Sequence, residues 1–94
     1  MDRKEMMDEA RRRVKSLSFG DIVTNVCAGP SNPIKRGIFV RRSGDWVECT
    51  DGTGRFWTIG VEVVFPGHLS DTESDRLFDP IHAALYGRYS KVDT

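Results

Sequence analysis

The stretch from residue 20 to residue 66 limits the fold of this chain more than any other feature. It contains five short segments rich in Val, Ile, Thr, Phe and Trp, which favour strands, and Gly, Pro, Asn and Asp separate them. Five strands with tight connections are too few for a β-sandwich, so we predict a small, strongly bent, five-stranded barrel. The segments read GDIVTNV, RGIFVRR, DWVECT, RFWTIG and VEVVFP.

A helical pattern precedes the predicted barrel. Asp2 and Glu5 have the spacing of a capping box, and apolar residues then recur at helical intervals, which predicts a helix over residues 2–17. We expect this apolar stripe to pack on the rest of the chain. A seam for a second copy is the alternative, although the stripe is short for a coiled coil. The stripe consists of Met6, Ala10, Val14 and Leu17.

A second helical pattern follows the barrel over residues 70–87. Ser70 and Glu73 again have the spacing of a capping box. Asp79 before Pro80 offers a second helix start, because proline is favoured at the first helical position and disrupts a helix interior. The segment is therefore either two short helices or one kinked helix. The expected fold class is α+β, mainly β, with a helix on each side of the barrel.

Length and charge restrict the partners of the chain. Its 94 residues suit a single domain, and residues 88–94 show no periodicity and are expected to form a tail. Fourteen Lys and Arg balance fourteen Asp and Glu, so the chain offers no strong field to a long polyanion, and nucleic acid is not the expected partner. No segment has the apolar length of a membrane span, which predicts a cytoplasmic protein with no membrane partner.

The residue types that carry metal or covalent chemistry are scattered. Cys27, Cys49, His68 and His82 stand alone, whereas structural zinc sites draw their ligands in close pairs. We expect the two cysteines to be reduced, small core residues. Neither a nucleophile signature nor a phosphate-binding loop is present in the sequence. The sequence therefore predicts no enzyme activity, no metal and no cofactor.

Aromatic and arginine residues near the second and third segments form the candidate binding site. If Ile38 and Val40 face the interior, strand alternation sends Phe39 and Arg41 outward, beside Trp46 of the next strand. Exposed aromatics next to guanidinium groups can stack a base or pair with phosphate. The alternatives are solvated arginines and aromatics packed under a helix. The candidate ligand-binding residues are Arg41, Arg42, Trp46, Phe39, Asn32 and Arg36.

The following segment also carries two aromatics. One of Phe56 and Trp57 must point away from the core, since neighbouring residues of a strand face opposite sides. We expect Trp57 to lie in the core or under a helix.

The motifs FGDIVTN, CAGPSNP, RGIFVRR and ECTDGTGRFW resemble short uncharacterised proteins of bacteriophages and prophages, which look like small SH3-like β-barrels. The similarity extends roughly over residues 19–59 and includes no catalytic residues. It implies an SH3-like barrel in a bacterial host cell. It also implies a role by stoichiometric binding, either to a host protein or to a nucleotide signal made by a defence system.

Two functions follow from these patterns. In the first, a non-enzymatic homo-oligomer sequesters a small nucleotide-like phosphorylated ligand in an anti-defence role, with Arg41 and Arg42 on phosphate and Trp46 stacking. In the second, an SH3-like module binds or inhibits a host or phage protein through the loop CAGPSNPIKR and the turn TDGTGR. Nucleic-acid binding through Arg11, Arg12 and Arg13 is a third and less favoured function.

Overall fold

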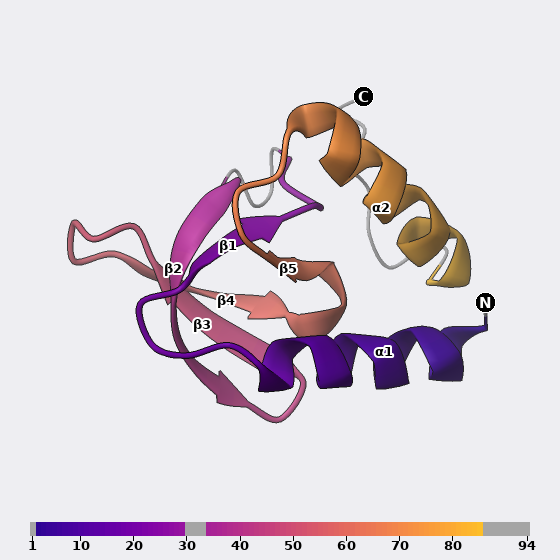
Figure 1. The fold of residues 1–94 in the computed structure, drawn as a ribbon, viewed down its shortest axis with the longest axis horizontal. Helices are drawn as coiled ribbons and strands as arrows, with labels where there is room; N and C mark the ends of the chain where they lie inside the picture. The colour runs from indigo at the N-terminus through magenta and orange to yellow at the C-terminus, as the bar shows by residue number, and fades with distance from the viewer. Residues whose placement is uncertain (1, 30–33, 86–94) are drawn as a thin grey trace.

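Figure 1 shows a sheet with a helix from each end of the chain packed beside it. The computed structural model describes residues 2–29 and 34–85. In chain order the elements are α1 (Arg3–Lys15), β1 (Ile22–Asn25), β2 (Arg36–Ser43), β3 (Trp46–Thr50), β4 (Phe56–Gly60), the 3₁₀ helix η1 (Val61–Val63), β5 (Val64–Pro66) and α2 (Asp71–Ala84).

The five strands form one antiparallel sheet in the order β4-β3-β2-β1-β5. The predicted barrel is wrong, because β4 and β5 stand at opposite ends of this order and do not pair, so the sheet is not closed. The cause lies in the segment VEVVFP, expected to be one strand. Its first half turns as η1, and the short β5 that remains pairs with β1. The fold is α+β, with an open sheet in place of an SH3-like barrel.

An extra residue in β2 changes which side chains reach the core. Phe39 pairs with Cys49 and Arg41 pairs with Glu48, so Val40 has no partner of its own on β3 and forms a bulge. Side chains of paired residues share a face, and Phe39 and Arg41 therefore lie on opposite faces. Phe39 is buried, 6 % exposed, which contradicts the expectation that it faces outward.

Helix α1 packs its apolar stripe against the rest of the same chain. The Asp2 carboxylate accepts the backbone N–H of Glu5 at 2.8 Å and caps the helix, as the spacing predicted. Met6, Ala10 and Val14 are buried in the core shared with the sheet. The expectation of intramolecular packing is confirmed, and these side chains are not available as a seam for a second copy.

Helix α2 is one helix that continues through Pro80, so the alternative of two short helices is wrong. Ser70 and Glu73 form the predicted capping box, with both reciprocal hydrogen bonds present. Phe78 and Ile81 are buried in the same core as the stripe of α1. The expected end of this helix at residue 87 and the tail at 88–94 lie outside the described residues.

The core lies on one face of the sheet, which we call the inner face. Cross-strand partners place Phe39, Cys49 and Trp57 on this face, and the two helices supply their buried residues to the same cluster. The other face is exposed over β2, β3 and β4, where Trp46 and Phe56 are among the exposed large apolar residues. We call it the open face.

Candidate functional site

A row of four register partners crosses the open face from β1 to β4. Ile22 pairs with Ile38, Ile38 with Thr50, and Thr50 with Phe56. Ile22 is 47 % exposed and Phe56 is 59 % exposed. We call these four residues the apolar row, since the hydroxyl of Thr50 is turned to the carbonyl of Arg55 at 2.7 Å. Large apolar side chains are usually buried in a core, whereas part of the surface of these side chains faces solvent.

A groove of about 450 Å³ lies over one end of the apolar row. The β3–β4 turn borders it, and a Cβ added at Gly52 would lie 3.9 Å from Cδ1 of Ile38. The segment between β5 and α2 also contributes to the lining. The volume falls in the range of small-molecule sites, about 300–1,000 Å³. The lining residues are Ile22, Arg36, Gly37, Ile38, Thr50, Asp51 and His68.

Hydrogen bonds of Asp51 shape the wall formed by the β3–β4 turn. Its carboxylate accepts the backbone N–H of Thr53 at 2.8 Å and also the Thr53 hydroxyl. These two bonds, the hydroxyl first, lower the pKa of Asp51 below its usual value, so this wall carries a negative charge at neutral pH. Gly52 and Gly54 adopt φ of +83° and +90°, which other residues rarely adopt.

Arg36 stands at the side of the groove near the β5–α2 segment. Its Nη2 donates to the carbonyl of Leu69 at 2.7 Å. Thr24, its register partner on β1, donates to the carbonyl of Gly67 at 2.7 Å and accepts the N–H of Leu69 at 3.0 Å. These contacts fix the β5–α2 segment over β1 and hold the guanidinium group beside it.

The predicted ligand-binding residues do not gather at one place. Arg41 and Trp46 lie on the open face, where Nε of Arg41 is 3.0 Å from Oε1 of Glu48 and Trp46 is 48 % exposed. Arg42 lies on the other face, because its register partner is the buried Val47. The two arginines expected to share a phosphate are therefore separated by the sheet.

The other three candidates also differ in position. Phe39 is buried and Arg36 lines the groove. Asn32 lies outside the described residues. The expectation for the aromatic pair of β4 is confirmed, since Phe56 is exposed and Trp57 packs against the core.

The sequence reasoning missed the apolar row. It treated Ile38 as an interior residue and did not consider Ile22 as part of a site. A signal was present in RGIFVRR, where Ile38, Phe39 and Val40 are consecutive apolar residues. A strand with one solvated face normally alternates, so such a run indicates apolar side chains on both faces.

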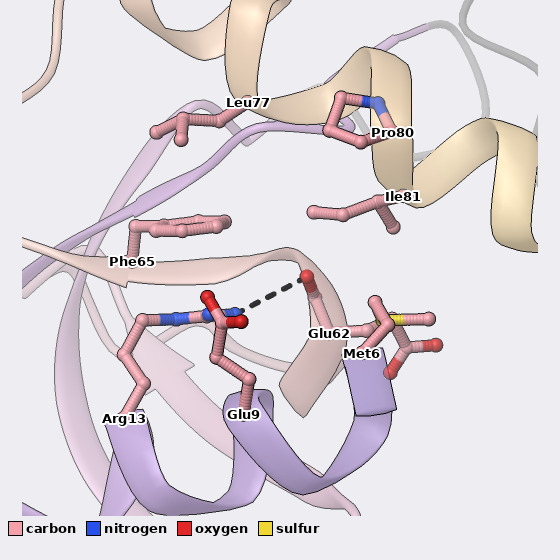
Figure 2. Close-up of a pocket in the computed structure, with 8 residues that line it drawn as sticks. All are labelled: Met6, Glu9, Arg13, Glu62, Phe65, Leu77, Pro80 and Ile81. Atoms are coloured by element: carbon pink, nitrogen blue, oxygen red, sulfur yellow. Dashed lines mark hydrogen bonds between the residues drawn. The ribbon is translucent and has the colours of Figure 1, made fainter. Parts of the chain in front are cut away.

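A second, smaller cavity of about 90 Å³ lies between the two helices and the η1–β5 segment (Figure 2). Arg13 dominates one wall, with its guanidinium carbon 3.7 Å from the centroid of the Phe65 ring. It donates to the carbonyls of Val64 at 2.9 Å, Val61 at 3.2 Å and Glu62 at 3.3 Å. Figure 2 shows the guanidinium group below the Phe65 ring and beside Glu62.

The contacts of Arg13 give it a structural role. Carbonyls at the end of a helix need donors, and Arg13 supplies them to η1 from the neighbouring helix. Burial lowers the pKa of Arg13, while the carboxylates of Glu9 and Glu62 oppose that shift. The guanidinium group remains charged, because an arginine side chain keeps its proton in proteins. We therefore assign this cavity to the packing of α1 against η1 and β5.

Within residues 2–29 and 34–85, no three metal-ligating side chains come together. No helix in this part of the chain has the length and apolar content of a membrane span.

No protein-family model, curated protein or solved structure gives a significant match to the chain. The open face itself is therefore the feature that indicates a function.

Proposed function

We propose that this protein is a non-enzymatic interaction module that binds a partner protein through the open face of its sheet. The apolar row is the observation that carries the proposal. Contiguous exposed apolar surface on a small protein commonly marks an interaction site, since its burial by a partner is favourable. Ile22 and Phe56, about half exposed, are two members of this row.

The surroundings of the apolar row also suit a protein interface. Interfaces combine an apolar centre, often with aromatic anchors, and a polar rim. Here the apolar row supplies the centre, and Trp46 adds a second exposed aromatic on the same face. Asp51 and the Arg41–Glu48 ion pair supply charges of both signs around it. The resemblance to phage proteins favours a partner from a bacterial host or a phage.

Sequestration of a small phosphorylated, nucleotide-like ligand is the second candidate. The groove volume of about 450 Å³ favours it, together with Arg36 in the lining. The two arginines that the sequence predicts to bind phosphate do not support this candidate, because Arg41 and Arg42 lie on opposite faces and Arg41 already contacts Glu48. Arg36 would have to bind the phosphate. The expected homo-oligomer would need a surface other than the buried helix stripes.

Comparative affinity capture tests the proposal. We would immobilise the wild-type protein, Phe56→Asp and Thr72→Asp, pass bacterial lysate over each, and quantify the retained proteins by mass spectrometry. Thr72 is exposed on α2 and provides the control for an added surface charge. We expect a set of proteins retained by wild type and Thr72→Asp and lost with Phe56→Asp. Equal retention by all three would refute binding through the open face.

Native mass spectrometry of the purified protein separates the two candidates. The proposed module should carry no bound small molecule. A retained phosphate-containing mass that disappears in Arg36→Gln would instead support the second candidate.

A further inference from the structure

The groove beside the apolar row has walls of opposite charge. Asp51 stands on the side of the β3–β4 turn, and Arg36 stands on the side of the β5–α2 segment. Ile22 and Ile38 are the apolar residues between them. A partner group that enters this groove meets an aliphatic floor, one cationic side and one anionic side.

The guanidinium group of Arg36 keeps hydrogen-bonding capacity. Of its five N–H donors, the bond to Leu69 uses one, and the guanidinium group makes no other hydrogen bond to a described residue. Its Nε is buried and has no acceptor among those residues. A buried cationic donor without an acceptor is costly, and an anion nearby would offset that cost.

The opposite wall does not accept an anion. The Asp51 carboxylate stays ionised beside Thr53, and it repels a second negative charge. The anionic part of an occupant is therefore directed to the Arg36 side, where His68 also lines the groove.

We propose that the groove binds a segment of a partner protein that presents an apolar side chain and an acidic side chain next to each other. The apolar side chain lies between Ile22 and Ile38, and the carboxylate pairs with Arg36. A guanidinium group and a carboxylate form charge-assisted hydrogen bonds of the kind that specify interfaces. This inference rests on the proposed function and adds the chemistry that the partner must present.

Three capped dipeptides serve as probes: N-acetyl-Phe-Asp-amide, N-acetyl-Phe-Asn-amide and N-acetyl-Phe-Lys-amide. They share the apolar side chain and differ in charge. We would titrate each into ¹⁵N-labelled protein and follow the backbone amides of Gly37, Ile38 and Thr50. We expect the Asp peptide to bind about two to five times more tightly than the Asn peptide, in line with an exposed ion pair, and also more tightly than the Lys peptide.

Two variants of Arg36 test its role. Arg36→Gln should reduce the affinity of the Asp peptide to that of the Asn peptide, and Arg36→Lys should keep part of the preference, because it keeps the charge. Arg12→Gln removes an exposed arginine of α1 and should keep the full preference. The amide spectra report whether each variant is folded.

Three outcomes would overturn the inference. Equal affinity for all three peptides would show that the groove binds apolar side chains without a preference for an acidic residue. That result would overturn the inference but not the proposed function. A preference for Asp that survives Arg36→Gln would assign it to another residue. Binding of phenyl phosphate without a response to any peptide would overturn the proposal that the groove binds a segment of a protein, and it would favour the small phosphorylated ligand.

Discussion

Phe39 and Arg41 lie on opposite faces of the sheet, although a single residue separates them in β2. Val40 is the extra residue, and the register moves by two positions on β2 and by one on β3 at this point. The bulge sends Phe39 into the core and Arg41 to the open face, where it contacts Glu48. The same shift also places Arg42 on the inner face.

The two residues should therefore differ in their effect on stability. Phe39→Ala leaves a cavity in the core and should lower the free energy of unfolding by about 3–5 kcal/mol. Arg41→Ala removes an exposed ion pair and should cost less than about 1 kcal/mol. Urea unfolding followed by tryptophan fluorescence measures both. Similar losses in the two variants would contradict the assignment of faces.

Arg13 should stabilise the fold far more than its neighbour Arg12. Arg13→Ala removes the side-chain hydrogen bonds to the carbonyls of Val61, Glu62 and Val64 and should cost about 1–3 kcal/mol. Arg12 is exposed, and Arg12→Ala is the matched control with almost no expected effect. Thermal unfolding of the two variants tests the prediction. An equal shift in Tm would show that the contacts of Arg13 are not structural.

The two cysteines should differ in reactivity. Burial raises the pKa of the Cys49 thiol to about 11, so only about one molecule in a thousand carries the thiolate at pH 8. Cys27 is half-buried. We expect iodoacetamide at pH 8 to modify Cys27 in the folded protein and Cys49 only after addition of denaturant, as followed by mass spectrometry. Equal rates in the folded protein would contradict the burial of Cys49.

The capping box of α2 should make part of the stability depend on pH. Hydrogen bonds from the backbone N–H and the hydroxyl of Ser70 lower the pKa of Glu73 below its ordinary 4.5. The folded protein therefore binds this proton less readily than the unfolded chain does. Its contribution is fully present above pH 4.5 and is lost as the pH falls through the lower, folded value.

Glu73→Gln should flatten this part of the profile. Glutamine keeps an acceptor for the N–H of Ser70 but does not titrate. We would compare Tm from pH 7 to pH 2.5 for wild type, Glu73→Gln and Asp79→Asn, which removes an exposed carboxylate from the same helix. A slope in Glu73→Gln as steep as in wild type would contradict the role of the capping box.

Local signals in the sequence predicted the helices and most strands. The capping boxes at Asp2 and Ser70 and the apolar stripe of α1 depend on contacts within a few residues, and all three are present in the structure. Whether the sheet closes into a barrel could not be predicted from such local signals. It depends on how β4 connects to β5, and the sequence VEV of Val61–Val63 alternates as a strand does although it folds as η1.

The candidate site was less predictable for a similar reason. Strict alternation of side chains in RGIFVRR fails at Val40, and no residue type in that segment indicates a bulge. The groove combines Ile22, Ile38 and His68 from different elements, and only the paired strands bring them together. The exposure of Phe56 and the packing of Trp57 were predictable, because neighbours in a strand must face opposite sides.

Site-specific photo-crosslinking tests the central claim most directly. The photoreactive amino acid p-benzoyl-phenylalanine would replace Phe56 on the open face in one variant and Thr72 on α2 in another, each expressed in bacterial cells and irradiated. The proposed function predicts a defined crosslinked protein from position 56 and none from position 72. Crosslinks from position 72 alone would contradict the assignment of the open face as the binding surface.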